Sequence, residues 1–515
     1  MSNTQSNNLR VAKNTVLLYL RMLLVMGVSL YTSRVVLNTL GVEDYGIYNV
    51  VGGVVSMFAF FNGAMLTSTQ RYLTFELGKG DIERLKLVFA TSIRIHAIIA
   101  IIIVLLTETI GLWFFYNKMV IPESRMVAAM WVLQLSVVTM VIQVMSVPYN
   151  SVIVAHEDMG VFAVISVIEV VLKLAIVYLL MIGSFDKLIL YAILVASVLL
   201  LIRFTYSIYC NRHYVETRSV RMKEKSLMLE MGKFAGWNVL GNLALMLMGT
   251  GVNMLLNMFF GPVVNAARAI AVQVESALIQ FSHNFQMAVN PQITKLYAQG
   301  NLDEMHYLLF RASKFTFFLL LALSLPVIIE TKTILTVWLK TVPDYTIQFL
   351  RLLLVIMLID STSRPLMTAA AATGNVKRYQ SVIGAILLGI VPVAYIVLRM
   401  GGDPTSVYVV YLIVIIIAFV SRLLIVAPMI HLSLSNYFIK VIIKCIGVFV
   451  FSSVIAFMVR NVLPQGLGYS FLVCVVSVCL VLFFAYFLGL SKGERLFINN
   501  KVKTVIVKFS HRERK

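Results

Sequence analysis

Residues 41–94 read "GVEDYGIYNVVGGVVSMFAFFNGAMLTSTQRYLTFELGKGDIERLKLVFATSIR", and residues 261–314 read "GPVVNAARAIAVQVESALIQFSHNFQMAVNPQITKLYAQGNLDEMHYLLFRASK". The two stretches align without a gap at a constant offset of 220 residues. Few residues are identical, so the constant offset is the evidence for an internal repeat. The matched positions include Gly41 with Gly261, Ser56 with Ser276, Thr74 with Thr294, Gly80 with Gly300, and Arg94 with Lys314.

A second pair of stretches matches at an offset of 217 residues. "PYNSVIVAHEDMGVFAVI" begins at Pro148, and "PLMTAAAATGNVKRYQSVI" begins at Pro365. The change of three residues falls where an outer loop is expected in each half. The repeat therefore covers most of two successive halves of the chain.

The composition indicates a polytopic membrane protein. The chain has 515 residues, a mean hydropathy of +0.90, and only 13% charged residues. A helix needs roughly 20 apolar residues to cross a bilayer. The first apolar run carries a charge and no cleavage signature, so we interpret it as a retained helix. Fourteen spans are expected, at about 14–37, 46–68, 88–115, 126–150, 160–182, 187–209, 234–259, 264–289, 312–336, 346–369, 380–400, 405–429, 440–460 and 468–490.

The spacing of the repeat predicts how the two halves are related. Six crossings separate each span from its repeat, so the halves share one orientation and a pseudo-two-fold axis along the membrane normal. The expected fold class is all-α, with two six-helix lobes and two additional helices. The expected divisions are an N-lobe at 1–210, a basic linker at 211–233, a C-lobe at 234–431, a helix pair at 432–490 and a basic tail at 491–515.

The formal net charge of +20 is best explained by topology. The basic linker, the basic tail and the loop at 70–86 fall on one side of the membrane. The positive-inside rule then places both termini in the cytoplasm. We therefore do not expect nucleic acid as a partner.

Four motifs of the chain resemble those of the polysaccharide-transport branch of the multidrug, oligosaccharidyl-lipid and polysaccharide (MOP) exporter superfamily, the Wzx-type O-antigen and capsule flippases. The resemblance covers residues from about 11 to 490. It is carried by "TLGVEDYGIYNVV", "TSTQRYLTFELGKGD", "PYNSVIVAHEDM" and "NPQITKLYAQGN".

The resemblance implies a MATE-like fold and a specific task in the bacterial inner membrane. The task is movement of an undecaprenyl-pyrophosphate-linked oligosaccharide between leaflets by alternating access, for O-antigen, capsule or exopolysaccharide synthesis. Membrane lipids are implied partners, and a coupling ion (H⁺ or Na⁺) and polysaccharide polymerase machinery are left open. No cofactor is implied.

Two ionisable residues lie near the middle of the span at 160–182. Glu169 and Lys173 are four residues apart with the acid first, which places them on one helical face in the favourable order. A charged group at a helix centre costs about 2.5–3.5 kcal/mol on insertion scales. The pair either lines a cavity, as a substrate site or a protonatable carboxylate, or forms a neutralised pair that locks helix packing.

Two arginines lie in the first span. Arg21 is close enough to the helix middle to reach a central cavity, or it extends back to the interface. Arg34, near the outer end, is a candidate gate or interfacial residue. The angle between them on an ideal helix excludes a shared face.

Further polar residues lie on the eighth and tenth spans. On the eighth, a stripe indicates a cavity-facing side. On the tenth, Asp360 precedes Arg364 by four residues just before Pro365, which indicates a gate or bend, or alternatively a capped helix end. The stripe consists of Asn265, Arg268, Glu275, Ser282 and Gln286.

No enzyme signature is present. Every expected outer loop is short, and we find no nucleotide-binding loop, nucleophile motif or metal-ligand spacing. The alternative function is a cation or drug antiporter on the same scaffold, which should rely on acidic cavity residues. Because the charges inside the spans are basic or balanced, an anionic cargo is favoured.

Overall fold

The computed structural model describes residues 3–56, 59–119, 121–180, 185–218, 224–339 and 342–496. Helices account for every regular element within these ranges. Residues 497–515, the C-terminal part of the expected basic tail, lie outside these ranges. The chain divides into two compact units, which are described separately. The first contains residues 1–247, 284–305 and 368–388, and the second contains residues 248–283, 306–367 and 389–515.

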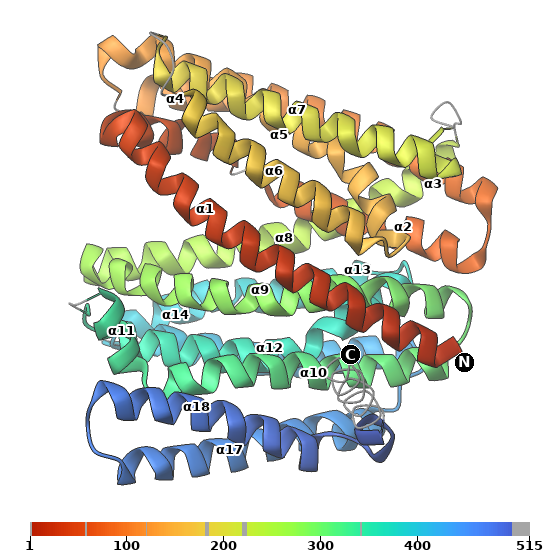
Figure 1. Cartoon of the computed structure of the whole chain (residues 1–515), viewed down its shortest axis with the longest axis vertical. Coiled ribbons are helices and arrows are strands. Elements are labelled where there is room, and N and C mark those ends of the chain that lie inside the picture. The colour runs from red at the N-terminus through yellow and green to blue at the C-terminus, as the bar shows by residue number, and fades with distance from the viewer. Residues whose placement is uncertain are drawn as a thin grey trace, which may run out of the picture. The chain divides into compact units, whose positions relative to one another are not determined.

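The first six expected spans all appear as helices, and they pack as one bundle (Figure 1). Within this bundle α5 packs against α2, α3 and α7, while α6 packs against α1 and α7. The elements are α1 (Asn3–Ser56), α2 (Ala59–Lys79), α3 (Ile82–Leu106), the π-helical η1 (Thr107–Gly111), α4 (Leu112–Lys118), η2 (Glu123–Arg125), α5 (Met126–Ala155), α6 (Met159–Leu179), α7 (Lys187–His213) and η3 (Val215–Arg218).

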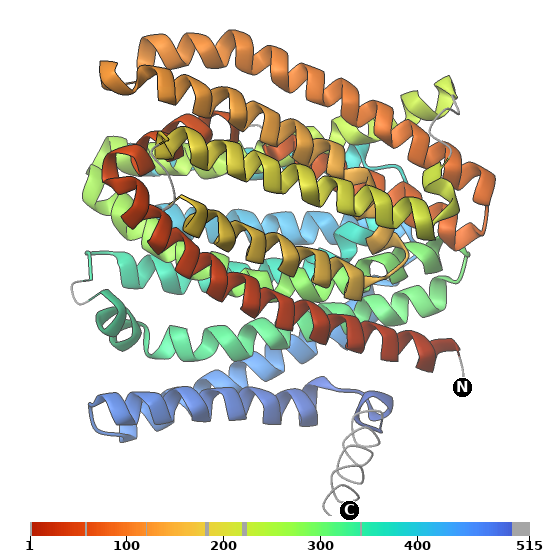
Figure 2. The same ribbon diagram turned by 45° about the horizontal axis from the view of Figure 1, so that its top comes forward.

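The remaining eight expected spans are also helical. The last two, α17 and α18, lie side by side in both views (Figures 1 and 2). The elements are α8 (Lys225–Phe260), α9 (Pro262–Ala298), α10 (Leu302–Ile329), α11 (Thr331–Leu339), α12 (Thr346–Ala372), α13 (Lys377–Leu388), α14 (Ile390–Arg399), α15 (Ser406–Met429), α16 (Leu434–Tyr437), η4 (Phe438–Ile442), α17 (Ile443–Val462), α18 (Leu467–Phe484) and η5 (Ala485–Gly489).

Eleven helical stretches in the described part of the chain are long and apolar enough to cross a membrane. The chain is therefore a multi-pass membrane protein. The expected spans in α1 and at the end of α1 with α2 are also helical, and Asn14–Ser29 of the first is an apolar stretch. The expected span in α9 is helical but more polar, with Arg268 and Glu275 inside it. Helices with polar faces are the ones expected to avoid lipid and face protein or a cavity.

Backbone geometry repeats where the sequence repeats. Gly41 and Gly261 have φ of +83° and +78°, and Gly80 and Gly300 have φ of +77° and +74°. A left-handed conformation is favourable for glycine because it has no Cβ. The glycines matched at an offset of 220 therefore make the same turns in both halves.

The two largest of the apolar clusters described in the first unit make up most of its core. One gathers around Val51, Ile103 and Leu133, and the other around Phe89 and Ile153. The pocket described below borders both clusters: Ile202 and Tyr206 of α7 belong to the second one and also line the pocket. The apolar clusters thus hold the helices around a polar middle section.

Candidate functional site

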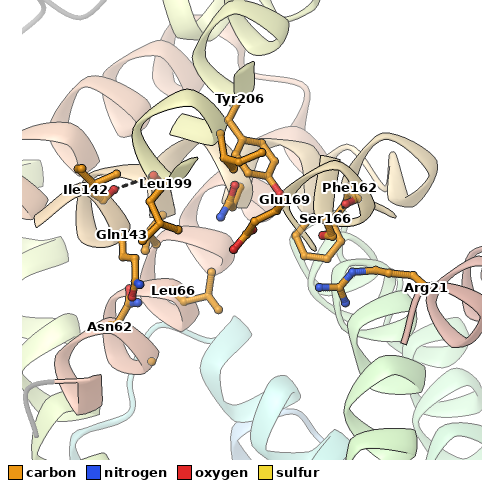
Figure 3. Close-up of a pocket in the computed structure, with 15 residues that line it drawn as sticks. Arg21, Asn62, Leu66, Ile142, Gln143, Phe162, Ser166, Glu169, Leu199 and Tyr206 are labelled. Atoms are coloured by element: carbon orange, nitrogen blue, oxygen red, sulfur yellow. Dashed lines mark hydrogen bonds between the residues drawn. The ribbon is translucent and has the colours of Figure 1, made fainter. Parts of the chain in front are cut away.

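A polar pocket opens among α1, α2, α5, α6 and α7 in the first unit (Figure 3). Its volume is about 450 Å³, which is within the usual range for small-molecule sites. More than half of its lining residues carry polar side chains. These are Arg21, Asn62, Gln143, Ser146, Asn150, Ser166, Glu169 and Tyr206.

Helical spacing explains why these side chains converge. On α5, Gln143, Ser146 and Asn150 follow steps of three and four residues and so share one face. On α6, Ser166 and Glu169 are three residues apart and share another face. Each helix therefore turns one polar stripe toward the pocket.

Arg21 reaches this pocket from α1. Its guanidinium carbon lies 4.6 Å from the centre of the Phe162 ring, a cation–π distance. Figure 3 shows the Arg21 guanidinium and the Glu169 carboxylate directed toward the same space. Arg21 therefore lines this pocket of the first unit.

Several polar atoms of the pocket are buried without a hydrogen-bond partner in the described part of the protein. They are Nε of Arg21 and the side-chain oxygens of Asn62 and Asn150. Buried polar atoms in folded proteins are normally paired. These atoms are thus available to a polar ligand: one donor and two acceptors.

Glu169 and Lys173 form the ion pair that their spacing predicts. The Lys173 Nζ lies 2.6 Å from Oε1 of Glu169. Only Glu169 lines the pocket, while the side chain of Lys173 is 38% exposed. The carboxylate is therefore at the pocket wall, and Lys173 neutralises it from beside the pocket.

A second polar site lies in the second unit, around Asp360 of α12. Arg422 of α15 lies 2.5 Å from Oδ1 of Asp360, and Arg364 lies 3.4 Å from Oδ2. Arg422 also donates to the Ser363 hydroxyl at 2.8 Å. Asp360 is thus bracketed by two arginines.

Two residues of α9 belong to this second site. Glu275 interacts electrostatically with Arg364, Asp360 and Arg268. Arg268 donates from Nη2 to the Gly249 carbonyl at 3.0 Å, and its Nε has no hydrogen-bond partner among the described residues. The site, called the arginine cluster below, contains Arg268, Arg364 and Arg422 with Glu275 and Asp360.

The structure also resolves the position of Asp360 along its helix. Pro365 lies inside α12, which continues to Ala372. The alternative of a capped helix end is therefore wrong, because the helix runs on for seven residues beyond the proline. The side chain of Arg34 lies outside the described part of the structure.

Sequence reasoning missed some of these residues. Arg422 was not singled out, although it is a charged residue in a stretch of mean hydropathy 2.9, and that contrast was the available signal. The pocket amides Asn62, Gln143 and Asn150 carry no such signal, since isolated amides are common in helix contacts within membranes.

Comparison with known proteins supports the fold but does not assign a family. No family model matches the chain, and no curated protein matches it in sequence. A solved structure of MATE in complex with MaL6 has a TM-score of 0.70 at 14% identity, over 84% of this chain and 99% of that chain. An outward-facing multidrug resistance MATE family transporter of the MOP superfamily has a TM-score of 0.71 at 14% identity, over 84% and 98%.

A third similar structure is a MOP superfamily transporter from Pyrococcus furiosus. It has a TM-score of 0.68 at 14% identity, over 85% of this chain and 99% of that chain. Its description states that a reverse polarity of its binding pocket suggests a different function. Together these structures show that the chain has a MATE-like fold, as the sequence analysis expected.

Proposed function

We propose that the chain is a flippase for a lipid-linked oligosaccharide, carried on undecaprenyl pyrophosphate, in the bacterial inner membrane. The cargo moves from the cytoplasmic to the outer leaflet by alternating access, with both chain termini in the cytoplasm. The exported repeat units then serve the synthesis of O-antigen, capsule or exopolysaccharide. The fold supports transport, because its solved neighbours are transporters.

The chemistry of the cargo determines what the protein must supply. A glycan head group cannot cross hydrocarbon unaided, since each unsatisfied polar group costs several kcal/mol there. A pyrophosphate also needs cationic partners. Arginine suits this role because its planar fork of donors matches phosphate oxygens.

The arginine cluster is the observation that carries the proposal. It places three arginines against two carboxylates inside a membrane protein, which leaves a positive excess. Arg268 keeps donor capacity, because its Nη2 donates to the Gly249 carbonyl while its Nε has no hydrogen-bond partner among the described residues. We assign Arg268 and Arg364 to the pyrophosphate.

The pocket of the first unit suits the sugar part of such a cargo. The unpaired amide oxygens of Asn62 and Asn150 can accept hydrogen bonds from sugar hydroxyls. Arg21 offers a donor at the same pocket. Lys173 neutralises Glu169 from beside the pocket, so Arg21 is the charged donor that faces the cargo there.

A second candidate function is an antiporter for organic cations or drugs. It is favoured by the carboxylate of Glu169 at the pocket wall and by the multidrug transporter among the structural neighbours. The positive excess at the arginine cluster argues against a cationic cargo. The polarity of the site is a useful discriminator here, since the reverse polarity of the binding pocket suggests a different function for one of the structural neighbours.

Reconstitution into liposomes distinguishes the two functions. One preparation receives a lipid-pyrophosphate-linked sugar and another an organic cation, and movement across the bilayer is scored. We expect Arg268→Ala to slow flipping of the lipid-linked sugar by at least about tenfold, while Arg268→Lys retains part of the rate. Cation movement without flipping of the lipid-linked sugar would contradict the proposal.

A matched control is Arg399→Ala. Arg399 is an exposed arginine at the end of α14 and contacts Tyr395, outside the arginine cluster. Its removal deletes one positive charge from the protein but should leave flipping unchanged. A loss of flipping in this variant equal to that of Arg268→Ala would show that total charge, rather than the cluster, is responsible.

A further inference from the structure

The ends of four helices, α2, α5, α9 and α12, are joined by hydrogen bonds within the first compact unit. Helices α2 and α5 belong to the first half of the repeat, and α9 and α12 to the second. All four ends lie on the side that we expect to be cytoplasmic. The residues that join them are Arg71, Glu157, Gln292 and Lys295, with the carbonyl groups of Ala371 and Ala372.

The first contact centres on Glu157, in the turn after α5. Its side chain is 1% exposed, and Oε1 lies 2.6 Å from Nζ of Lys295. Gln292 donates a short hydrogen bond to Oε2. The Glu157 carbonyl accepts a further bond from Nδ2 of Asn14 at 3.1 Å. One buried carboxylate of the first half is thus held by two side chains of the second half.

The second contact centres on Arg71, near the end of α2. The guanidinium donates from Nε to the Ala371 carbonyl at 3.1 Å and from Nη2 to the Ala372 carbonyl at 2.9 Å. These carbonyls lie at the end of α12, where the Ala371 carbonyl also accepts from the Gly374 N–H at 3.0 Å. The rings of Tyr72 and Phe75 flank the guanidinium at 4.4 and 4.7 Å.

The two contacts occupy equivalent positions in the repeat. Glu157 corresponds to Gly374 at the offset of 217, and both have positive φ, 62° and 80°. Lys295, the partner of Glu157, corresponds to Phe75 at the offset of 220. Phe75 flanks Arg71, whose Nη2 would be 2.7 Å from a Cβ placed on Gly374. The turn after α5 thus has a carboxylate at this position. The equivalent turn after α12 has a glycine, whose missing side chain leaves room for the Arg71 guanidinium.

A third contact joins the ends of α2 and α9 themselves. Gly78 and Ala298 correspond to each other at the offset of 220. A Cβ placed on Gly78 would lie 2.9 Å from the Cβ of Ala298, so the two ends are in direct contact. When equivalent residues of two repeats touch, the contact lies at the axis that relates the repeats. The four helix ends therefore meet around that axis.

We propose that the Glu157 and Arg71 contacts form a two-part latch that closes the cytoplasmic entrance and must break before cargo can enter. The inference rests on the proposed alternating-access function. Arg71 caps backbone carbonyls, which lack a full charge. The Glu157–Lys295 pair is therefore the part of the latch that depends on charge.

The burial of Glu157 makes the latch cooperative. A buried carboxylate that loses its partner keeps the cost of its desolvation, so the pair separates readily only when water reaches both groups. Opening of the pair and wetting of the entrance are then one event. Partial opening is disfavoured, as a gate between two discrete states requires.

Hydrogen exchange measured by mass spectrometry on the full-length protein, without any cargo, tests the latch. In Glu157→Gln we expect peptides at 71–80 and 291–300 to exchange on the order of tenfold faster than in wild type. Lys295→Gln should give the same result and serves if the first variant does not fold. Unchanged exchange in both variants would overturn the proposal.

The charge reversal provides a stricter test. Combining Glu157→Lys with Lys295→Glu should restore slow exchange, while either reversal alone should not. Failure of the combination would show that the ion pair does not hold the latch. Glu83→Gln is the matched control: Glu83 pairs with Lys86 at 2.6 Å, but its side chain is 70% exposed, so exchange at the latch should not change.

This experiment separates the latch from the transport function. Exchange reports the helix ends without reference to any cargo, whereas the liposome assay reports the cargo. Fast exchange in Glu157→Gln together with no flipping of a lipid-linked sugar by wild type would support the latch and reject the proposed cargo. Unchanged exchange in Glu157→Gln and Lys295→Gln, together with flipping of the lipid-linked sugar by wild type, would reject the latch and support the proposed cargo.

Discussion

At the scale of single residues, the two arginines beside Asp360 differ in their surroundings. The Arg422 side chain is 5% exposed and contacts both Asp360 and the Ser363 hydroxyl. Arg364 is 19% exposed and lies farther from the carboxylate. We therefore assign Arg422 to the stability of the cluster and leave Arg364 for the cargo.

Replacing Arg422 by Met should lower the free energy of unfolding by about 1.5–3 kcal/mol, because Asp360, whose side chain is 21% exposed, loses the charged hydrogen bond to its nearest cation. Adding Asp360→Asn should recover a large part of the loss, since the uncompensated charge is then removed. Thermal unfolding of the purified protein in detergent measures both effects. A loss of equal size in Arg364→Met would contradict the division of roles.

Part of the candidate site could be predicted from the sequence. Arg21, Glu169, Arg268 and Asp360 stand out because a charge inside an apolar span is costly and needs an explanation. The contribution of Asn150 could not be predicted, because an amide in a span has the same local pattern whether it packs or lines a pocket. Its role depends on which helices approach it.

At the scale of elements, the helix pair α17 and α18 is fixed to α10 near one end by Glu494. The Glu494 carboxylate lies 2.9 Å from Nζ of Lys314, which is in α10, and both side chains are almost completely buried. Close contact continues at Gly489, where a Cβ would lie 2.5 Å from the Phe318 ring of α10.

Glu330, which follows α10, fixes the other end of the pair. Its Oε1 lies 2.5 Å from Nε of Arg460, at the end of α17. Its Oε2 accepts from the Ser470 hydroxyl, near the start of α18, at 2.9 Å. The helix pair is therefore held to α10 near both of its ends.

The ion pair between Glu494 and Lys314 makes the stability of the folded protein depend on pH. Burial acts to raise the pKa of Glu494, but Lys314 and the amide of Ser491 outweigh it, so the pKa lies below its ordinary value of 4.5. A carboxylate whose pKa is depressed by folding stabilises the fold above the unfolded pKa. This stability is lost as the pH falls from about 4.5 through the folded pKa.

We therefore expect Glu494→Gln to destabilise the protein at pH 7 by about 3–5 kcal/mol, since Lys314 loses its partner in a buried site. The difference between variant and wild type should shrink as the pH is lowered below about 4.5. Thermal unfolding over a pH series measures it. A difference that is constant across the series would contradict the assignment.

At this scale, the sequence predicts which segments are helical better than it predicts where each helix ends. The constant offset located equivalent turns, which Gly41 and Gly261 confirm. The expected break after the first span lies at Gly41, whose non-helical backbone (φ 83°, ψ 166°) separates the two helical parts of α1. Pro148 and Pro365 lie inside α5 and α12, because packing against neighbouring helices outweighs the lost hydrogen bond.

At the scale of the whole molecule, the two compact units do not coincide with the two halves of the sequence repeat. The first compact unit combines the first half with residues 284–305 and 368–388 of the second half. Those two segments carry the partners of Glu157 and Arg71. The repeat predicts which segments are equivalent, but it contains no information on which equivalent segments touch. That information comes from non-local contacts such as Glu157 with Lys295.

The solved neighbours match over 98–99% of their own length but over only 84% of this chain, so the chain has helices beyond the shared fold. We expect these to include α17 and α18, and we expect the pair to be essential to stability. A chain that ends at residue 431 would lack Glu494 and Arg460, the partners of Lys314 and Glu330, and would uncover the side of α10 that these residues share with the helix pair. The two unpaired charges would then lie on a surface left to lipid or detergent, where a charge is unfavourable.

The shortened chain should therefore unfold at a much lower temperature than the full chain, and adding Lys314→Met with Glu330→Gln should recover part of the difference. The recovery is expected because the two substitutions remove the uncompensated charges without restoring the lost helix contacts. Thermal unfolding followed by size-exclusion chromatography measures it. If the double substitution gave no recovery, the ion pairs would not be what makes the helix pair necessary, and apolar contact with α10 would have to account for it.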